Sequence, residues 1–151
     1  MGFSEDDVLW NEFLSLWPLE RLRTMSLPEY TTSGDNNCFI YWLEFRLGSY
    51  GSIAGGSAFK FGIFSRGNSD PKAPHNELAY DDKYGWYSKF GASAAEAFEK
   101  IRGNVVAIAE AAAAGQLESI DQCPLGPAIR WKIAFHYQSR TSPLIPCVYL
   151  R

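Results

Sequence analysis

Aromatic rings and lysines occur together in one stretch of this sequence, YDDKYGWYSKFG at residues 80–91. Ring faces can stack a nucleobase, and ammonium groups beside them can hold its phosphates. The candidate stacking residues are Tyr84, Trp86 and Tyr87, and the candidate phosphate contacts are Lys83 and Lys89. The same residues also fit a small aromatic core beneath a long loop. Both interpretations stay open at the level of the sequence.

A glycine-rich stretch, GSIAGGSAFKFGIFSR at residues 51–66, raises the question of phosphate binding again. It is not a P-loop, because that motif needs a lysine and a Ser or Thr directly after its last glycine. Here Gly56 is followed by Ser57 and Ala58. The glycines therefore serve a tight helix-to-strand passage, or their backbone N–H groups approach a nucleic-acid phosphate with Lys60 and Arg66 beside them.

Residues for metal binding and acid–base catalysis are few and scattered. His75 and His136 lie far apart, and neither has a partner at metal-ligand spacing. No nucleophile motif or paired-carboxylate motif occurs. We therefore expect no catalytic residue, no metal and no cofactor, and we expect the domain not to be an enzyme. The odd number of cysteines, at wide spacing, predicts reduced thiols in a cytoplasmic protein.

Length and charge set the remaining limits. A chain of 151 residues predicts a single domain over residues 1–151, and no apolar run is long enough to span a membrane. The acidic N-terminus lacks the features of a secretory signal. The net charge of −3 divides unevenly, with −5 on residues 1–50 and +2 on residues 51–151. The second part therefore has either a local positive face or a mixed solvated surface.

Helices are expected in the first third of the chain and again around residue 100. Ser93 and Glu96 form a capping box, apolar residues follow at steps of three and four, and Gly115 ends the pattern. This predicts a long helix over 93–114. Further helices are expected from Ser4 to Trp17, over 27–32, and from Asp35 or Asn36 to Leu47.

Strands are expected where apolar and polar residues alternate. The alternation predicts strands at 57–64, 129–138 and 144–150, and a short strand at 77–80 within a long connection. Arg130 and Lys132 then lie on the polar face of the strand 129–138. The fold class that follows is α+β, with N-terminal helices and one long helix packed on a mostly antiparallel β-sheet.

Several blocks of the chain together resemble the N-terminal region of McrB-like AAA+ proteins, the GTPase subunits of modification-dependent (type IV) restriction systems. These blocks are WPLERLRTMSLPEYT, FIYWLEFRLGSYGSIAGGSAFKFGIF, YGWYSKFG, AAEAFEKIR and RWKIAFHYQ. The resemblance covers nearly the whole chain. The AAA+ signatures are absent from it, and the chain ends without a linker, which favours a domain cut from a longer polypeptide.

The resemblance implies a target-recognition domain for antiphage defence. Such a domain reads double-stranded DNA, often at a modified (methylated) cytosine, in some cases by flipping the base into an aromatic pocket. The implied partners are the AAA+ module of the parent chain and an McrC-like nuclease subunit. The alternative is a protein-interaction or assembly module of an AAA+ defence complex. The candidate nucleic-acid-binding residues are Lys60, Arg66, Lys83, Tyr84, Trp86, Tyr87, Lys89, Arg130 and Lys132.

Overall fold

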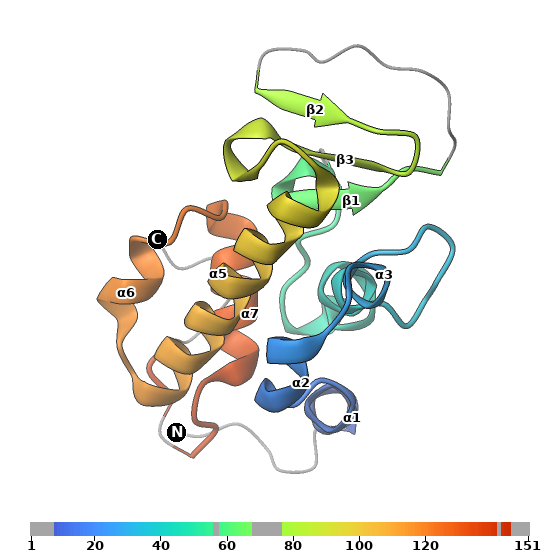
Figure 1. Cartoon of the computed structure of the whole chain (residues 1–151). Helices are drawn as coiled ribbons and strands as arrows, with labels where there is room; N and C mark the ends of the chain where they lie inside the picture. Colours follow the sequence, from blue (N-terminus) through green and yellow to red (C-terminus); the bar gives the residue numbers. More distant parts are fainter. Residues whose placement is uncertain (1–7, 56–57, 68–76, 142, 146–151) are drawn as a thin grey trace.

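A computed structural model of the chain describes residues 8–55, 58–67, 77–141 and 143–145. A body of helices carries a small β-sheet at one end (Figure 1). The α-helices are α1 (Val8–Leu16), α2 (Leu19–Thr24), α3 (Leu27–Tyr30), α4 (Phe39–Tyr41), α5 (Ala94–Ala114), α6 (Leu117–Asp121) and α7 (Pro127–Tyr137). A π-helical turn, η1 (Trp42–Arg46), continues α4, and the 3₁₀ turns are η2 (Gly48–Tyr50), η3 (Ala58–Phe61) and η4 (Ser88–Phe90).

The sheet has three antiparallel strands in the order β1-β3-β2. They are β1 (Ile63–Ser65), β2 (Leu78–Tyr80) and β3 (Tyr84–Tyr87). Trp86 of the central strand pairs with Ile63 on one side and with Ala79 on the other. The expected short strand at 77–80 is confirmed. The stretch 80–91, interpreted from the sequence as a loop, instead contains the central strand of the sheet.

The long helix α5 follows its sequence signals closely. The Ser93 hydroxyl accepts the backbone N–H of Glu96, and Gly115 ends the helix in the left-handed conformation. Its apolar residues Ile101, Val105 and Ile108 are buried, and the helix packs on the sheet and on α7. The predicted helix over 93–114 and the α+β fold class, with a long helix on an antiparallel sheet, are confirmed.

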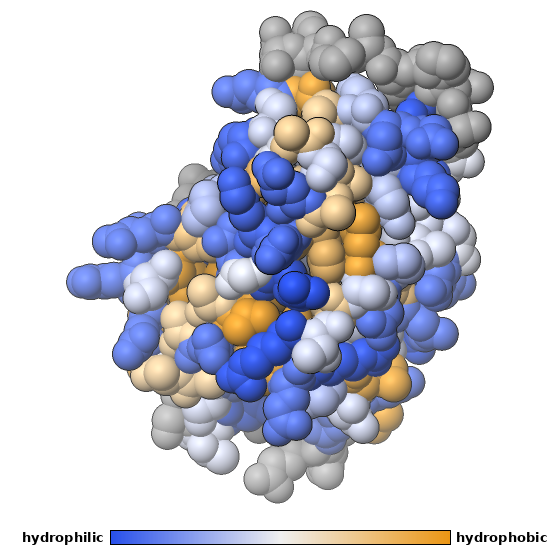
Figure 2. Space-filling view, in the orientation of Figure 1, coloured by the Kyte–Doolittle hydropathy of each residue, from blue (hydrophilic) through white to orange (hydrophobic). Residues whose placement is uncertain are grey.

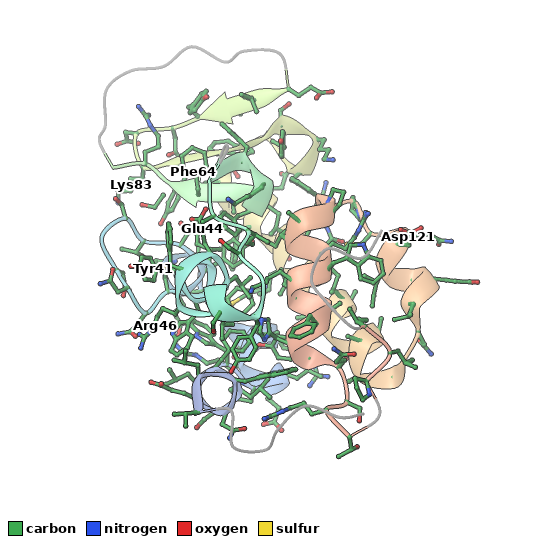
Figure 3. All side chains as sticks on the ribbon, turned by 180° about the vertical axis from the view of Figure 1, so that it is seen from behind. Tyr41, Glu44, Arg46, Phe64, Lys83 and Asp121 are labelled. Carbon is green, nitrogen blue, oxygen red and sulfur yellow. The ribbon has the colours of Figure 1, made fainter. Side chains whose placement is uncertain are left out.

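The central helix of the body is α7, and the strand predicted at 129–138 was wrong. Neighbours on several sides, among them α1, α5, α6 and η1, bury seven of the 11 residues of α7 (Figure 3). Lys132 and His136 are among the buried residues, so the alternation of polar and apolar residues did not mark an exposed face and did not indicate a strand. Gly126 followed by Pro127 at the first helical position was the helix signal that this interpretation missed.

Two further strand predictions differ from the structure. Within 57–64, Ala58–Phe61 forms the turn η3, and only Ile63 onward is a strand. Gly62 separates them with φ of +82°, a left-handed conformation that an extended run cannot contain. Of the strand predicted at 144–150, Leu144 and Ile145 are not extended ladder residues, and 146–150 lie outside the described part.

The N-terminal helices match their predictions in part. Ser26 and Glu29 make both hydrogen bonds of a capping box at the start of α3. The third predicted helix begins later than expected, at Phe39, and its second half is the π-helical turn η1. The first predicted helix is described from Val8 onward as α1, so its cap at Ser4 lies outside the described residues.

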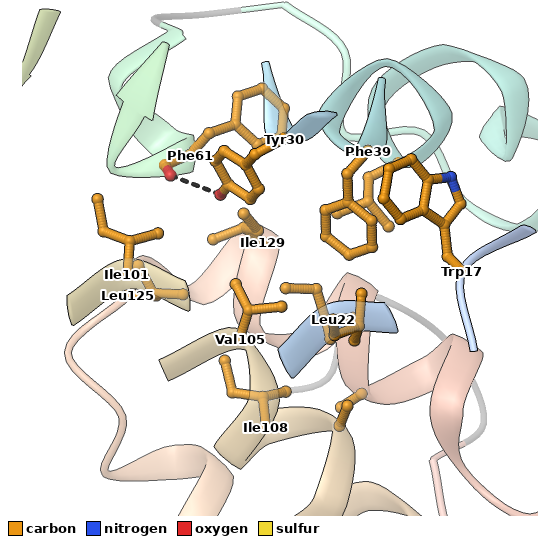
Figure 4. Close-up of a cluster of buried hydrophobic side chains, with 14 of the residues drawn as sticks. Trp17, Leu22, Tyr30, Phe39, Phe61, Ile101, Val105, Ile108, Leu125 and Ile129 are labelled. Carbon is orange, nitrogen blue, oxygen red and sulfur yellow. Dashed lines mark hydrogen bonds between the residues drawn. The ribbon is translucent and has the colours of Figure 1, made fainter. Parts of the chain in front are cut away.

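Aromatic and branched side chains from helices and sheet form one core (Figure 4). Tyr30 and Phe39 stack with ring centroids 5.8 Å apart, and the Tyr30 hydroxyl donates to the Phe61 carbonyl at 2.7 Å. This bond joins α3 to the segment that leads into β1. The core therefore fixes the position of the sheet relative to the helices.

The surface seen in Figure 2 is mainly hydrophilic, and hydrophobic residues appear on it only in small separate groups. Among the helices that the structure describes, none is both long and apolar enough to cross a membrane.

Candidate functional site

A cavity of about 270 Å³ opens where the end of the sheet meets the start of α7. Aromatic and aliphatic groups form part of its wall, and two lysines and one carboxylate line it as well. The lining residues are Lys60, Gly62, Glu77, Tyr87, Lys89, Phe90, Pro124, Leu125 and Gly126. Three of the residues proposed from the sequence, Lys60, Tyr87 and Lys89, therefore come together here. We call this space the sheet-end cavity.

Close backbone contacts hold the sheet-end cavity together. Tyr87 donates its N–H to the Gly62 carbonyl at 3.1 Å, which joins the end of β3 to the turn before β1. A Cβ at Gly62 would lie 2.9 Å from Ile101 Cδ1, so only glycine lets this turn approach α5. At Gly91, after η4, a Cβ would lie 2.8 Å from the Ala97 backbone nitrogen. These two glycines place the aromatic wall against α5.

Lys89 crosses one side of the cavity. Its Nζ donates to the Pro124 carbonyl at 3.3 Å and lies 5.6 Å and 5.2 Å from the ring centroids of Tyr87 and Phe90. An ammonium at these distances is attracted to the ring faces. The side chain is therefore oriented along the cavity wall while its residue remains exposed.

Lys60 has a different role from the one expected. Its Nζ forms an ion pair with Glu44 Oε2 at 2.6 Å and donates to the carbonyls of Ile53 and Gly55. An ammonium has three hydrogens, so these three acceptors occupy it fully. Lys60 thus holds residues 53–55 of the glycine-rich stretch against η1. The approach of the glycine N–H groups to a phosphate stays a prediction.

Arg66, Lys83 and Tyr84 form a second group at the turn between β2 and β3. Asp81 organises it, because its carboxylate accepts the backbone N–H groups of Lys83 and Tyr84. Arg66 donates to the Asp81 carbonyl. Burial, and then the Asp81 charge, raises the pKa of Tyr84, which keeps its hydroxyl protonated. Lys83 is exposed at this end of the molecule (Figure 3).

The other three proposed residues do not belong to either group. Trp86 is only 3% exposed, and its indole N–H donates to the Gly91 carbonyl, so it is a core residue and cannot act as a pocket or wedge. Arg130 donates to the carbonyls of Cys123 and Leu125 behind the cavity wall. Trp86 and Arg130 therefore support the structure around the cavity, but the Trp86 ring and the Arg130 guanidinium are not accessible to a base.

Lys132 lies in the interior of the fold. The strand predicted at 129–138 would have exposed it on a polar face, but this segment is the helix α7, which buries it. Its Nζ donates to the carbonyls of Leu47 and Gly51 at 2.7 Å and 2.6 Å. Burial lowers the pKa of its ammonium to about 8. Lys132 therefore connects α7 to the start of the glycine-rich stretch and has no surface for a phosphate.

Sequence reasoning missed the remaining walls of the cavity. Phe90 was part of the aromatic stretch but was not singled out, and Glu77 looked like one surface acid among many. The run from Pro124 to Gly126 was the available signal, because a Pro- and Gly-rich segment before a helix marks a turn that can shape a pocket.

The described side chains of the sheet-end cavity supply aromatic rings, ammonium groups, a hydroxyl and one carboxylate. Within the described ranges no group of three His, Cys, Asp or Glu residues could hold a metal ion. Comparison with protein-family models, with curated proteins and with solved structures gave no match to this chain.

Proposed function

We propose that this chain is a DNA-binding specificity domain that reads modified double-stranded DNA, as the N-terminal domain of an McrB-like restriction protein in the cytoplasm. In that proposal its AAA+ module and an McrC-like nuclease subunit act on the DNA that this domain selects. The observation that carries it is the sheet-end cavity, where the half-buried ring of Tyr87 lies beside Lys89, whose Nζ is 5.6 Å from the ring centroid. Ring faces beside ammonium groups are the materials of nucleotide binding.

A base extruded from a duplex needs a site of this kind. Extrusion costs a few kcal/mol in lost stacking and pairing, which stacking and hydrogen bonds in the protein must offset. A cavity of about 270 Å³ lies just below the usual range for drug-sized ligands, so its size favours a small planar ring over a larger molecule.

Cations at the same end of the molecule support contact with the DNA backbone. Lys83 and Lys89 are both exposed, and they lie at the two ends of strand β3. Phosphate contacts position a protein on a duplex without reading its sequence. In this proposal Lys83 holds the backbone, and the sheet-end cavity, with Lys89 in its wall, receives the base.

The test is a fluorescence-polarisation panel with unmodified, methylated, hydroxymethylated and glucosylated duplexes at two ionic strengths. We expect binding that weakens steeply with salt and that favours at least one modified duplex. Lys89→Gln should weaken that binding, whereas Lys100→Gln, an exposed lysine of α5 outside the cavity, should not. Absent or salt-insensitive binding to every duplex would contradict the proposal.

A second candidate, a protein-interaction module of an AAA+ defence complex, is favoured by one observation. Phe45 on η1 is 51% exposed, and its ring lies 5.0 Å from that of Tyr41. Exposed aromatic residues are typical anchors of protein interfaces. If this function holds, Phe45→Ser weakens binding to the separately expressed AAA+ module of the parent protein and leaves DNA binding unchanged.

A further inference from the structure

The carboxylate of Glu77 is the one acidic group in the lining of the sheet-end cavity that the structure describes. Its backbone is fixed, because the Glu77 carbonyl accepts both the N–H and the hydroxyl of Ser88. Within the described part of the chain, no hydrogen bond or ion pair occupies its side-chain oxygens, and neither Lys60 nor Lys89 pairs with it. The cavity thus contains a hydrogen-bond acceptor without a partner.

Lys89 supplies donors to the same cavity. Of its three hydrogens, the structure assigns one to the Pro124 carbonyl. The remaining two are available to a ligand, whereas all three hydrogens of Lys60 already have acceptors. Among the described lining side chains, Glu77 is therefore the carboxylate acceptor and Lys89 the ammonium donor that can receive a ligand, and the Tyr87 hydroxyl adds a group that can donate or accept.

We propose that Glu77 and Lys89 are the specificity-determining pair of the sheet-end cavity, and that they bind the hydrogen-bonding edge of a nucleobase held against Tyr87. This inference rests on the proposed function of DNA binding and names the residues that would read the base. The Watson–Crick edge of every nucleobase has donors beside acceptors, which is the complement of a carboxylate beside an ammonium. Glu77 accepts from a ring N–H or amino group, and Lys89 donates to a carbonyl or ring nitrogen.

The charge of Glu77 decides between a base and a phosphate. A carboxylate on the wall repels an anion, which is how a site rejects the wrong group. The Tyr87 ring adds wall area that a phosphate cannot use, whereas a planar base can stack on it. The cavity is therefore suited to a neutral ring with a polar edge, and a phosphate contact remains on Lys83 outside the cavity.

The experiment measures binding of the whole chain to duplexes with one altered position. That position holds each of the four bases in turn, an apolar ring of the same outline, or an abasic residue, always opposite an abasic residue so that a base leaves the stack at low cost. Wild-type protein should prefer at least one natural base over the abasic duplex by roughly tenfold or more. Glu77→Gln should reduce that preference by roughly tenfold.

The controls separate edge reading from other effects. Glu77→Gln should leave affinity for the apolar ring and for the abasic duplex unchanged, and Lys89→Gln should reduce the base preference as well. Glu99→Gln, an exposed residue of α5 with the same change in charge, should behave as wild type. Thermal unfolding followed by circular dichroism verifies that each variant is folded.

Three results would overturn the inference. If Glu77→Gln keeps the full base preference, Glu77 does not read the base. If it strengthens binding to all duplexes equally, a phosphate and not a base occupies the cavity. If the wild-type protein binds all of these duplexes equally, the domain binds DNA without reading a base here. Absence of any DNA binding by wild-type protein is a different result, because it contradicts the proposed function itself.

Discussion

His136 is a buried ionisable side chain of α7 whose protonation affects the stability of the fold. It is completely buried on α7, and the rings of Trp10, Phe13, Tyr50 and Phe135 lie 5.0–5.8 Å from it. Neither ring nitrogen has a hydrogen-bond partner among the described residues. Burial, and then the charge of the neighbouring lysine on α7, lowers its pKa well below 6.5, so the imidazole is neutral in the folded protein.

The first prediction concerns this histidine and acid. Because the folded-state pKa is lowered, the unfolded chain binds the additional proton below pH 6.5, and the free energy of unfolding falls as the pH falls through that range. His136→Leu should remove this component and, by eliminating two unpaired polar atoms, raise stability at neutral pH by about 1 kcal/mol. Urea unfolding of both proteins at about pH 7 and about pH 5 measures the effect. An equal acid loss in both proteins would refute it.

At the scale of elements, the sheet-end cavity depends on the turn between η3 and β1. Gly62 makes this turn with a φ of +82°, and its missing side chain lets the backbone approach Ile101 of α5. The same residue accepts the N–H of Tyr87 from the central strand. One glycine therefore determines how the sheet and the long helix meet.

A pair of glycine substitutions tests this point. Gly62→Ala should destabilise the protein by roughly 1–3 kcal/mol, because an L-residue is strained at this φ and its Cβ would lie 2.9 Å from Ile101 Cδ1. Gly103→Ala is the matched control, because Gly103 lies within α5 and a Cβ there meets nothing within 4 Å. It should stabilise the protein by roughly 0.5–1 kcal/mol. Equal effects of the two substitutions in denaturant unfolding would contradict this account.

Across the whole molecule, basic residues divide into internal and external groups. Arg130 and Lys132 bond to carbonyl groups inside the fold, and Lys60 is occupied by Glu44 and two carbonyls. Lys83 and Lys89 remain exposed at the sheet end, and no carboxylate in the described residues pairs with either. Among the candidate nucleic-acid-binding residues, the exposed lysines are therefore the two at this end.

The salt dependence of binding tests that distribution. Lys83→Gln should weaken binding to modified and unmodified duplexes alike and should reduce the slope of log K against log salt concentration by about 1, since one phosphate contact is lost. Stability should not change, because Lys83 is exposed. Polarisation titrations at several salt concentrations measure the slope. An unchanged slope would exclude Lys83 from the interface.

Sequence reasoning was most successful where short-range chemistry dictates structure. The caps at Ser26 and Ser93 and the glycine at 115 act within one helical turn, and the helices α3 and α5 that they predict are present. It failed for α7, because most residues of this helix are buried and no exposed polar face shows the helical period in the sequence. It also failed for β3, because Tyr84–Tyr87 becomes a central strand only by pairing with a strand on each side.

The sequence by itself determined the start of α3, the boundaries of α5, the α+β class and the aromatic and basic residue types from which a nucleotide site can be made. Only the tertiary structure decided which of them share a surface. It placed Trp86 and Lys132 in the interior and brought Glu77, Tyr87 and Lys89 to one cavity. The physical reason is that capping and periodicity act over a few residues, whereas burial and the assignment of hydrogen-bond partners depend on segments that are far apart in the chain.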